Sequence, residues 1–142
     1  MRCTLSIKVI LLVFCLTACL VPTALSAKAH LYISPDMQHV TIGQTFDVVV
    51  NIQDVADSPA DSSMRGASVK IAFDPSVLQV VSQTEGSFLR TFGSTLPFPF
   101  HDNSAGWAQF DNAILGGSGV LAHGPGDLYS IRFEAVTNGT TT

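Results

Sequence analysis

Four carboxylates are the candidates for the acid and base of a hydrolase: Asp74, Glu85, Asp102 and Asp111. Such chemistry needs two carboxyl groups facing one bond of the substrate, or a nucleophile beside a base. Asp74 and Glu85 belong to turn sequences instead, and Asp102 belongs to a loop. Asp111 has the outward parity of a strand. The sequence therefore predicts that this protein is not an enzyme.

Residues that bind metals are present but lack the spacing of a metal site. The histidines show no HxH or HxxxH pattern and have no cysteine near them: His30, His39, His101 and His123. Three aspartates share a polar loop, but the glycine and the spacing of an EF-hand loop are missing: Asp54, Asp57 and Asp61. The glycine-rich residues 116–119 indicate a turn and not a phosphate-binding loop, because no lysine follows them and no helix is expected to begin there. We expect no metal ion and no other cofactor.

Residues 1–27 are typical of an export signal. They have a basic start, an apolar run from Val9 to Val21 that is too short to span a bilayer comfortably, and small residues after it. We expect cleavage near Ala27 and a secreted domain of residues 28–142. The alternative is that "LTAC", which ends at Cys19, resembles the lipobox of bacterial lipoproteins. Lipidation there would anchor the protein at the cell surface.

Charge and cysteine content restrict both the partner and the forces that hold the domain together. Loss of the signal removes Arg2 and Lys8, which leaves five of the seven Lys and Arg residues against all 11 Asp and Glu residues. An acidic surface argues against nucleic acid as a partner, and no basic block indicates a membrane patch. All three cysteines lie within the signal, so the domain depends on its core and not on disulfides.

Apolar and polar residues alternate along three segments, which is the pattern of half-buried strands. These segments are residues 46–53, 67–74 and 128–135. No segment carries a sustained helical stripe, and turn sequences lie between the strands. One wet face on each strand implies two stacked antiparallel sheets. The predicted fold class is an all-β antiparallel sandwich of one domain, most simply a jelly roll.

Shorter strands are expected at residues 31–34, 77–82, 87–89, 98–100 and 107–113. Pro75 ends one strand because its ring fixes φ and it has no N–H, and Asp74 is expected to cap the turn. The apolar residues of 77–82 do not alternate strictly. We therefore expect that strand to be covered on both sides.

Trp107 is the most prominent candidate for a binding residue. If Phe110 and its alternate neighbours point inward, then Trp107, Gln109 and Asp111 point outward. An exposed tryptophan on a flat sheet suits a protein partner or a sugar ring. The alternative is that the ring folds over the edge of the sandwich and completes the core.

Four segments, in this order, resemble the cohesin domain, the receptor module of cellulosome scaffoldins: "IGQTFDVVVNI", "IAFDPSVLQVVSQTEGSFL", "DNSAGWAQFDNAILGGSGV" and "LYSIRFEAVTNGTTT". The similarity runs from about His30 to the end. It implies a nine-stranded jelly roll without an active site, which binds a dockerin-type partner on one sheet face, with calcium carried by the partner. In the family a last strand follows the Gly-Thr-Thr-Thr position, so the resemblance implies a domain truncated by one strand.

The chain departs from the family pattern at contact positions. Aligned on the Asp74-Pro75 corner, the polar contact residues of many cohesins fall at Gly66 and Ser68. A contact position that is apolar in the family is occupied here by Asp111, and a contact position that is acidic in the family is occupied here by Ile114. These differences concern partner recognition and not the fold.

The predicted partner-binding face combines these positions with strand parity. The strands at 67–73, 107–113 and 128–135 are expected to be neighbours in one sheet and to present a nearly flat patch. Its residues are Ser68, Lys70, Trp107, Gln109, Asp111, Ile114, Ser130 and Arg132. The predicted function is non-catalytic extracellular recognition of a dockerin-type partner, in polysaccharide degradation or cell-surface assembly. The alternatives are a carbohydrate-binding module of the same architecture and a structural surface domain without a partner.

Overall fold

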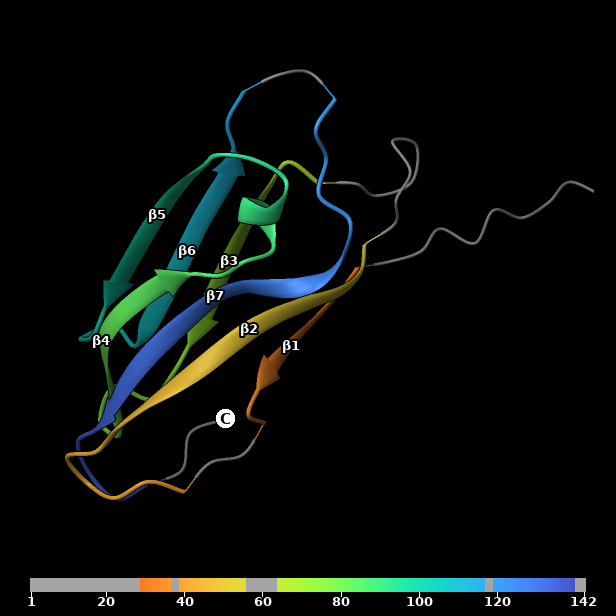
Figure 1. Ribbon diagram of the computed structural model, residues 1–142. Coiled ribbons are helices and arrows are strands. Elements are labelled where there is room, and N and C mark those ends of the chain that lie inside the picture. The colour runs from red at the N-terminus through yellow and green to blue at the C-terminus, as the bar shows by residue number, and fades with distance from the viewer. Residues whose placement is uncertain (1–28, 37–38, 56–63, 117–118, 140–142) are drawn as a thin grey trace, which may run out of the picture.

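The computed structural model describes residues 29–36, 39–55, 64–116 and 119–139 (Figure 1). The predicted export signal with Cys19 and the polar loop around Asp57 and Asp61 lie outside these residues. Within the described part, no helix is long and apolar enough to cross a membrane.

Two stacked antiparallel sheets form the domain (Figure 1). The four-stranded sheet has the order β1-β2-β7-β4, and the three-stranded sheet has the order β3-β6-β5. A 3₁₀ turn, η1 (Leu89–Thr91), separates β4 from β5. The strands are β1 (His30–Ser34), β2 (Thr45–Val55), β3 (Gly66–Ala72), β4 (Leu78–Glu85), β5 (Thr95–Asp102), β6 (Trp107–Ile114) and β7 (Gly124–Ala135). The predicted all-β sandwich is confirmed.

The core lies between the two sheets and consists of alternate residues of their strands. Phe133 of β7 packs against Phe46 and Phe73, with ring centroids 5.9 and 5.3 Å away. Phe110 of β6 stacks on Tyr129 of β7, with centroids 4.9 Å apart, and this pair joins the two sheets. Burial raises the pKa of Tyr129, so its hydroxyl stays neutral. Buried aromatic rings of this size contribute much of a sandwich's stability.

The corner after β3 has the geometry that its sequence predicts. The Asp74 carboxylate accepts hydrogen bonds from the backbone N–H and the hydroxyl of Ser76, at 2.8 and 2.6 Å. Gly106 packs against this corner with φ +69°, and a Cβ atom there would lie 2.4 Å from the carbonyl oxygen of Phe73. The turn before β6 therefore requires glycine, because any side chain would collide with the corner.

The strand after the corner differs from the expectation. β4 is an edge strand of its sheet, and Val81 is 50% exposed next to an irregularity in register between Val80 and Ser82. The prediction that both faces are covered is wrong, because the local shift turns one valine of the apolar run toward water. The predicted strand at residues 87–89 is also wrong, since these residues lead into η1.

Prolines protect the free edge of β5. The N–H of Ile114 donates to the carbonyl of Arg65 at 2.7 Å, so alternate residues of β6 direct their backbone groups toward β3. Asn112 and Phe110 lie opposite Pro97 and Pro99, and they have the same parity as Ile114, so their backbone groups also point toward β3. The backbone of each proline is therefore not hydrogen-bonded to β6 and faces the free edge, where any other residue would present an N–H. β5 therefore offers few donors to a further strand.

Candidate partner-binding face

The outer face of the three-stranded sheet carries most of the residues that the sequence singles out. Its strands are aligned so that Lys70, Gln109 and Phe100 form one row across the sheet. Ser68, Asp111 and Phe98 form the next row. We call this surface the outer face, made up of Ser68, Lys70, Leu96, Phe98, Phe100, Trp107, Gln109 and Asp111. The predicted outward parity of Trp107, Gln109 and Asp111 is confirmed, because Ala108, Phe110 and Asn112 are buried.

Asp111 lies at the centre of a small polar network on this face. The Ser68 hydroxyl donates to Asp111 Oδ1 at 2.6 Å. Gln109 Nε2 donates to Oδ1 and Oδ2 at 3.0 and 3.1 Å. The hydrogen bonds from Ser68 and then Gln109 hold the pKa of Asp111 below its usual value. The carboxylate therefore stays ionised and fixed in orientation on the sheet surface.

Trp107 is half-buried, and its ring is in contact with the neighbouring strand. The ammonium of Lys70 lies 4.2 Å from the centroid of the ring. A cation over the face of an indole is attracted by its π electrons, and the aliphatic stem of lysine covers apolar surface. Trp107 thus neither stands free nor joins the core fully. It forms a cation–π pair with Lys70 at one end of the outer face.

Three exposed apolar side chains of β5 complete the face, and the face predicted from the sequence does not include them. Leu96, Phe98 and Phe100 are 44, 47 and 49% exposed. They share one side of β5 because alternate residues of a strand point the same way. The signal in the sequence was the run "LPFPF", in which prolines at every second position indicate an edge strand and leave the aromatic residues on one face.

A shallow hollow lies between this apolar row and the Asp111 network. Its volume is about 380 Å³, and its lining includes Ser68, Leu96, Phe98, Asp111 and Ala113. We call it the Asp111 hollow. Apolar side chains form most of its walls, and Asp111 is the one ionised group among its lining residues.

Three residues of the predicted face lie elsewhere. Ile114 is only 5% exposed, because it follows the parity of the buried residues of β6. Ser130 and Arg132 belong to β7, which pairs with β2 and β4 in the other sheet. The prediction that β7 neighbours β3 and β6 is wrong, since sheet order depends on distant pairing and not on local parity.

Arg132 has a partner on its own sheet. Its guanidinium donates two hydrogen bonds to Asp47, at 2.9 and 2.8 Å, across neighbouring strands. These hydrogen bonds hold the pKa of Asp47 below its usual value. Both side chains are about half exposed, so the pair contributes little to stability. The outer face of the four-stranded sheet is thus an ordinary solvated surface at this point.

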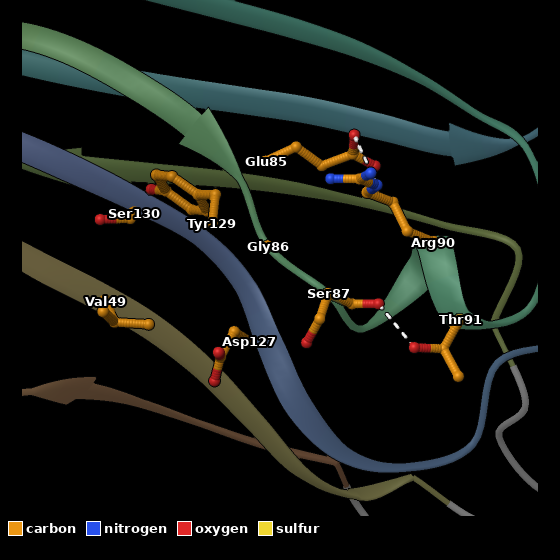
Figure 2. A pocket seen from close by; sticks show the side chains of 9 residues that line it. All are labelled: Val49, Glu85, Gly86, Ser87, Arg90, Thr91, Asp127, Tyr129 and Ser130. Atoms are coloured by element: carbon orange, nitrogen blue, oxygen red, sulfur yellow. Dashed lines mark hydrogen bonds and ion pairs between the residues drawn. The ribbon is translucent and has the colours of Figure 1, made fainter.

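A second and larger hollow lies at the end of β4 (Figure 2). Its volume is about 510 Å³, and Glu85, Arg90, Thr91 and Tyr129 are among its lining residues. Some of its polar groups make structural contacts: Thr91 Oγ1 donates to the carbonyl of Ser87 at 2.9 Å, and Arg90 faces Glu85. These contacts hold the end of β4 to η1.

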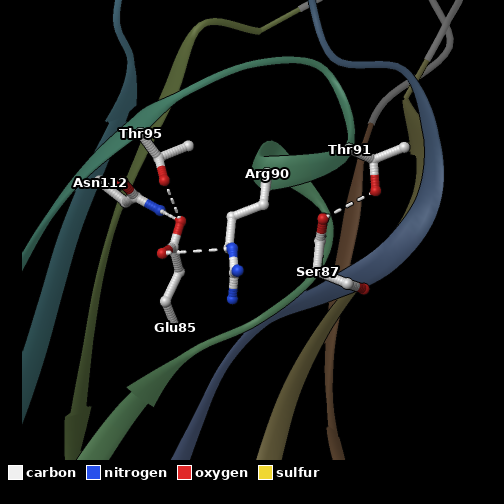
Figure 3. Close-up of polar contacts among 6 residues, drawn as sticks. All are labelled: Glu85, Ser87, Arg90, Thr91, Thr95 and Asn112. Atoms are coloured by element: carbon white, nitrogen blue, oxygen red, sulfur yellow. Dashed lines mark hydrogen bonds and ion pairs between the residues drawn. The ribbon is translucent and has the colours of Figure 1, made fainter.

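Glu85 joins the two sheets at this end of the sandwich (Figure 3). Its Oε1 accepts a 2.8 Å hydrogen bond from the Asn112 amide of β6 and a short one from the Thr95 hydroxyl of β5. Arg90 Nε lies 3.9 Å from its other oxygen. The carboxylate that the sequence places in a turn is therefore a cross-sheet contact.

The candidate acids have structural partners. Asp74 caps the first corner, and Asp102 accepts hydrogen bonds from the backbone of Ser104 and Ala105 at 2.8 and 3.0 Å. In the described ranges, His, Cys, Asp and Glu side chains form no group of three or more that could hold a metal ion. What the outer face offers is a flat surface for recognition, with an apolar row, an ionised carboxylate and a lysine–tryptophan pair.

Comparison with known proteins agrees with this architecture. The family model described as Cohesin domain matches residues 34–142. No curated protein matches the chain at a significant level.

Solved structures from Acetivibrio cellulolyticus share the fold. The chain is similar to a structure of the Coh3ScaB-XDoc_M1ScaA complex, a type II Cohesin-X-Dockerin complex, with TM-score 0.65 and 18% identity over 81% of this chain and 75% of that chain. It is also similar to the second type II cohesin of the ScaA scaffoldin, with TM-score 0.63 and 18% identity over 81% and 69% of the two chains. The third cohesin of ScaC, solved with the ScaB dockerin, gives TM-score 0.55 and 18% identity over 71% and 72%.

Proposed function

The chain belongs to the cohesin domain family, whose members are non-catalytic binding modules, and on this basis we propose that it binds a dockerin-type protein through the outer face of its three-stranded sheet. The partner would carry the calcium, as the family resemblance implies, and this chain would supply the surface that the partner binds. Two of the similar structures contain a cohesin together with a dockerin. The protein would thus act by recognition alone.

The observation that carries this proposal is the row of exposed apolar side chains on β5. Leu96, Phe98 and Phe100 each expose nearly half of their surface on one side of a strand. Contiguous apolar surface rimmed by polar groups is typical of protein interaction sites. The opposite sheet also exposes apolar side chains, Leu31 and Ile33 on β1 and Val81 on β4, but these strands are its two edges, and the Asp47–Arg132 pair lies on the strands between them. The outer face instead has three apolar side chains on one strand beside the polar network of Asp111, and this arrangement favours it as the partner-binding surface.

Direct carbohydrate binding remains a second candidate function, because Trp107, Phe98 and Phe100 lie on one face. Flat aromatic rings stack on sugar rings in many binding proteins. Lys70 argues against this use, since it covers one side of the Trp107 ring. A protein partner needs no bare indole and fits the observed pair better.

One experiment separates the two functions. The purified protein is titrated by calorimetry with calcium-loaded dockerins, including the X-dockerin and the ScaB dockerin of Acetivibrio cellulolyticus, and is incubated with insoluble glycans. We expect one-to-one binding to at least one dockerin, lost when calcium is removed, and no retention on glycans. Retention on a glycan without binding to any dockerin would contradict the proposal.

We expect Trp107→Ala to weaken dockerin binding by roughly tenfold, which corresponds to about 1.4 kcal/mol. The substitution removes the ring from the proposed interface, together with its contact with Lys70, but the side chain is half-buried at the surface and not part of the core cluster. Calorimetry gives the affinity, and the melting temperature reports folding. Arg132→Glu on the other sheet is the control and should leave the affinity unchanged. Unfolding by Trp107→Ala, or equal effects of both variants, would contradict the assignment.

We further propose that this recognition takes place outside the cytoplasm, in polysaccharide degradation or cell-surface assembly. The support is the export-like composition of residues 1–27. We expect the protein exported by a bacterial host to begin at or near Lys28, as measured by the mass of the intact chain. A product that begins at Cys19 with a lipid mass would favour the lipoprotein alternative. An unprocessed chain retained in the cytoplasm would contradict export.

A further inference from the structure

The Asp111 hollow combines apolar walls with a carboxylate at its edge, and few chemical groups of a ligand suit both. Leu96, Phe98 and Ala113 supply apolar walls, and Asp111 supplies a carboxylate at the edge. An apolar side chain placed there would cover the carboxylate and remove it from water. Burying an ionised group without a counter-charge costs far more than the apolar contact returns.

Asp111 has no cationic partner among the residues that the structure describes. Its hydrogen bonds come from Ser68 and Gln109, which are both neutral. Lys70, the cation of the adjacent strand, is held over the ring of Trp107. The carboxylate is therefore oriented by its neighbours but not neutralised by them.

We infer that the Asp111 hollow receives an arginine or lysine side chain of the protein partner. The aliphatic stem would lie along Leu96, Phe98 and Ala113, and the cationic head would bind the carboxylate of Asp111. Long basic side chains have this division between an apolar stem and a charged head. The chain carries 11 acidic residues against seven basic ones, so its overall charge also favours a basic partner surface. This inference rests on the proposed function, because it describes how the same face recognises its partner.

A side-chain mimic tests the inference without the natural partner. The ¹⁵N-labelled protein is titrated with n-butylguanidinium chloride at low ionic strength, and amide chemical shifts are followed by NMR. We expect shifts concentrated at Ser68, Phe98 and Ala113, with a dissociation constant on the order of 10 mM for a ligand of this size. The neutral analogue 1-butanol should bind about threefold to fivefold more weakly, which is the upper part of the range for an exposed ion pair. Pentanoate should not bind the hollow.

Variants assign the effect to the carboxylate. Asp111→Asn should weaken the cationic mimic by about threefold to fivefold and remove its advantage over 1-butanol. Asp111→Glu keeps the charge and should retain that advantage. Glu134→Gln removes a carboxylate from the other sheet, and it should change nothing. Dispersed amide spectra of the free variants, changed only near the substituted residue, will show that each is folded.

Three results would overturn the inference. These are 1-butanol binding as tightly as the cationic mimic, an unchanged dissociation constant of the cationic mimic for Asp111→Asn, and chemical-shift changes centred outside the hollow. The dockerin titration is separate. Cation binding at the hollow with no dockerin bound would refute the proposed function alone, and dockerin binding that is insensitive to Asp111→Asn would refute the inference alone.

Discussion

Replacing Phe98 with aspartate is expected to lower the affinity for the dockerin-type partner by at least about thirtyfold, which corresponds to about 2 kcal/mol. The ring is 47% exposed and lies beside Asp111 in the register of β5 and β6. The substitution removes apolar contact at the centre of the face and places a second carboxylate next to the first. Desolvating both on binding would be costly. Calorimetry with the bound dockerin measures the loss.

The matched control is Val81→Asp. Val81 is 50% exposed, but it lies on β4 in the opposite sheet. The substitution introduces the same charge at an equally exposed apolar residue, and we expect no change in the affinity for the dockerin. If both variants weaken binding equally, net charge and not the outer face decides recognition. If Phe98→Asp unfolds the protein, the ring belongs to the structure and not to the interface.

Replacing Glu85 with alanine is expected to reduce the free energy of unfolding by about 2–3 kcal/mol. The side chain is only 14% exposed and accepts hydrogen bonds from Thr95 and Asn112. Asn112 is itself buried, so its amide would lose its acceptor and keep the cost of leaving water. Chemical denaturation followed by tryptophan fluorescence measures the change.

Arg90→Ala is the control for this contact. Arg90 is 64% exposed and lies 3.9 Å from Glu85, so its removal should cost much less than removal of the carboxylate. A loss for Arg90→Ala as large as that for Glu85→Ala would mean that the ion pair carries the stability. A loss below about 0.5 kcal/mol for Glu85→Ala, the low end for one hydrogen bond, would show that the contact does not hold the sheets together.

Local patterns predict much of this fold, because strand parity is a local property. Alternation gives the inward residues of β2, β3, β6 and β7, and it gives the outward direction of Trp107 and Asp111. The Asp74 cap also follows from the residues around it. The same parity predicts that Ile114 is buried. Its assignment to the binding face came from a family position, which the local pattern contradicts.

Long-range pairing accounts for most of the remaining errors. The outward side of Arg132 is predictable, but the sheet to which β7 belongs depends on its pairing with β2 and β4. The cross-sheet role of Glu85 likewise depends on β5 and β6 passing beside it. Phe98 and Phe100 are absent from the predicted face for another reason: residues 98–100 are predicted only as a short strand, although the alternate prolines of the run indicate an edge strand whose aromatic residues share one face.

The most direct test of dockerin recognition by the outer face is an amide NMR map of the ¹⁵N-labelled protein with the calcium-loaded dockerin that binds it. We expect the largest chemical-shift changes along β3, β6 and β5, at Ser68, Phe98 and Gln109 in particular, with β1 and β2 little affected. Changes concentrated on the β1-β2-β7-β4 sheet, or no change with any dockerin of the panel, would contradict it.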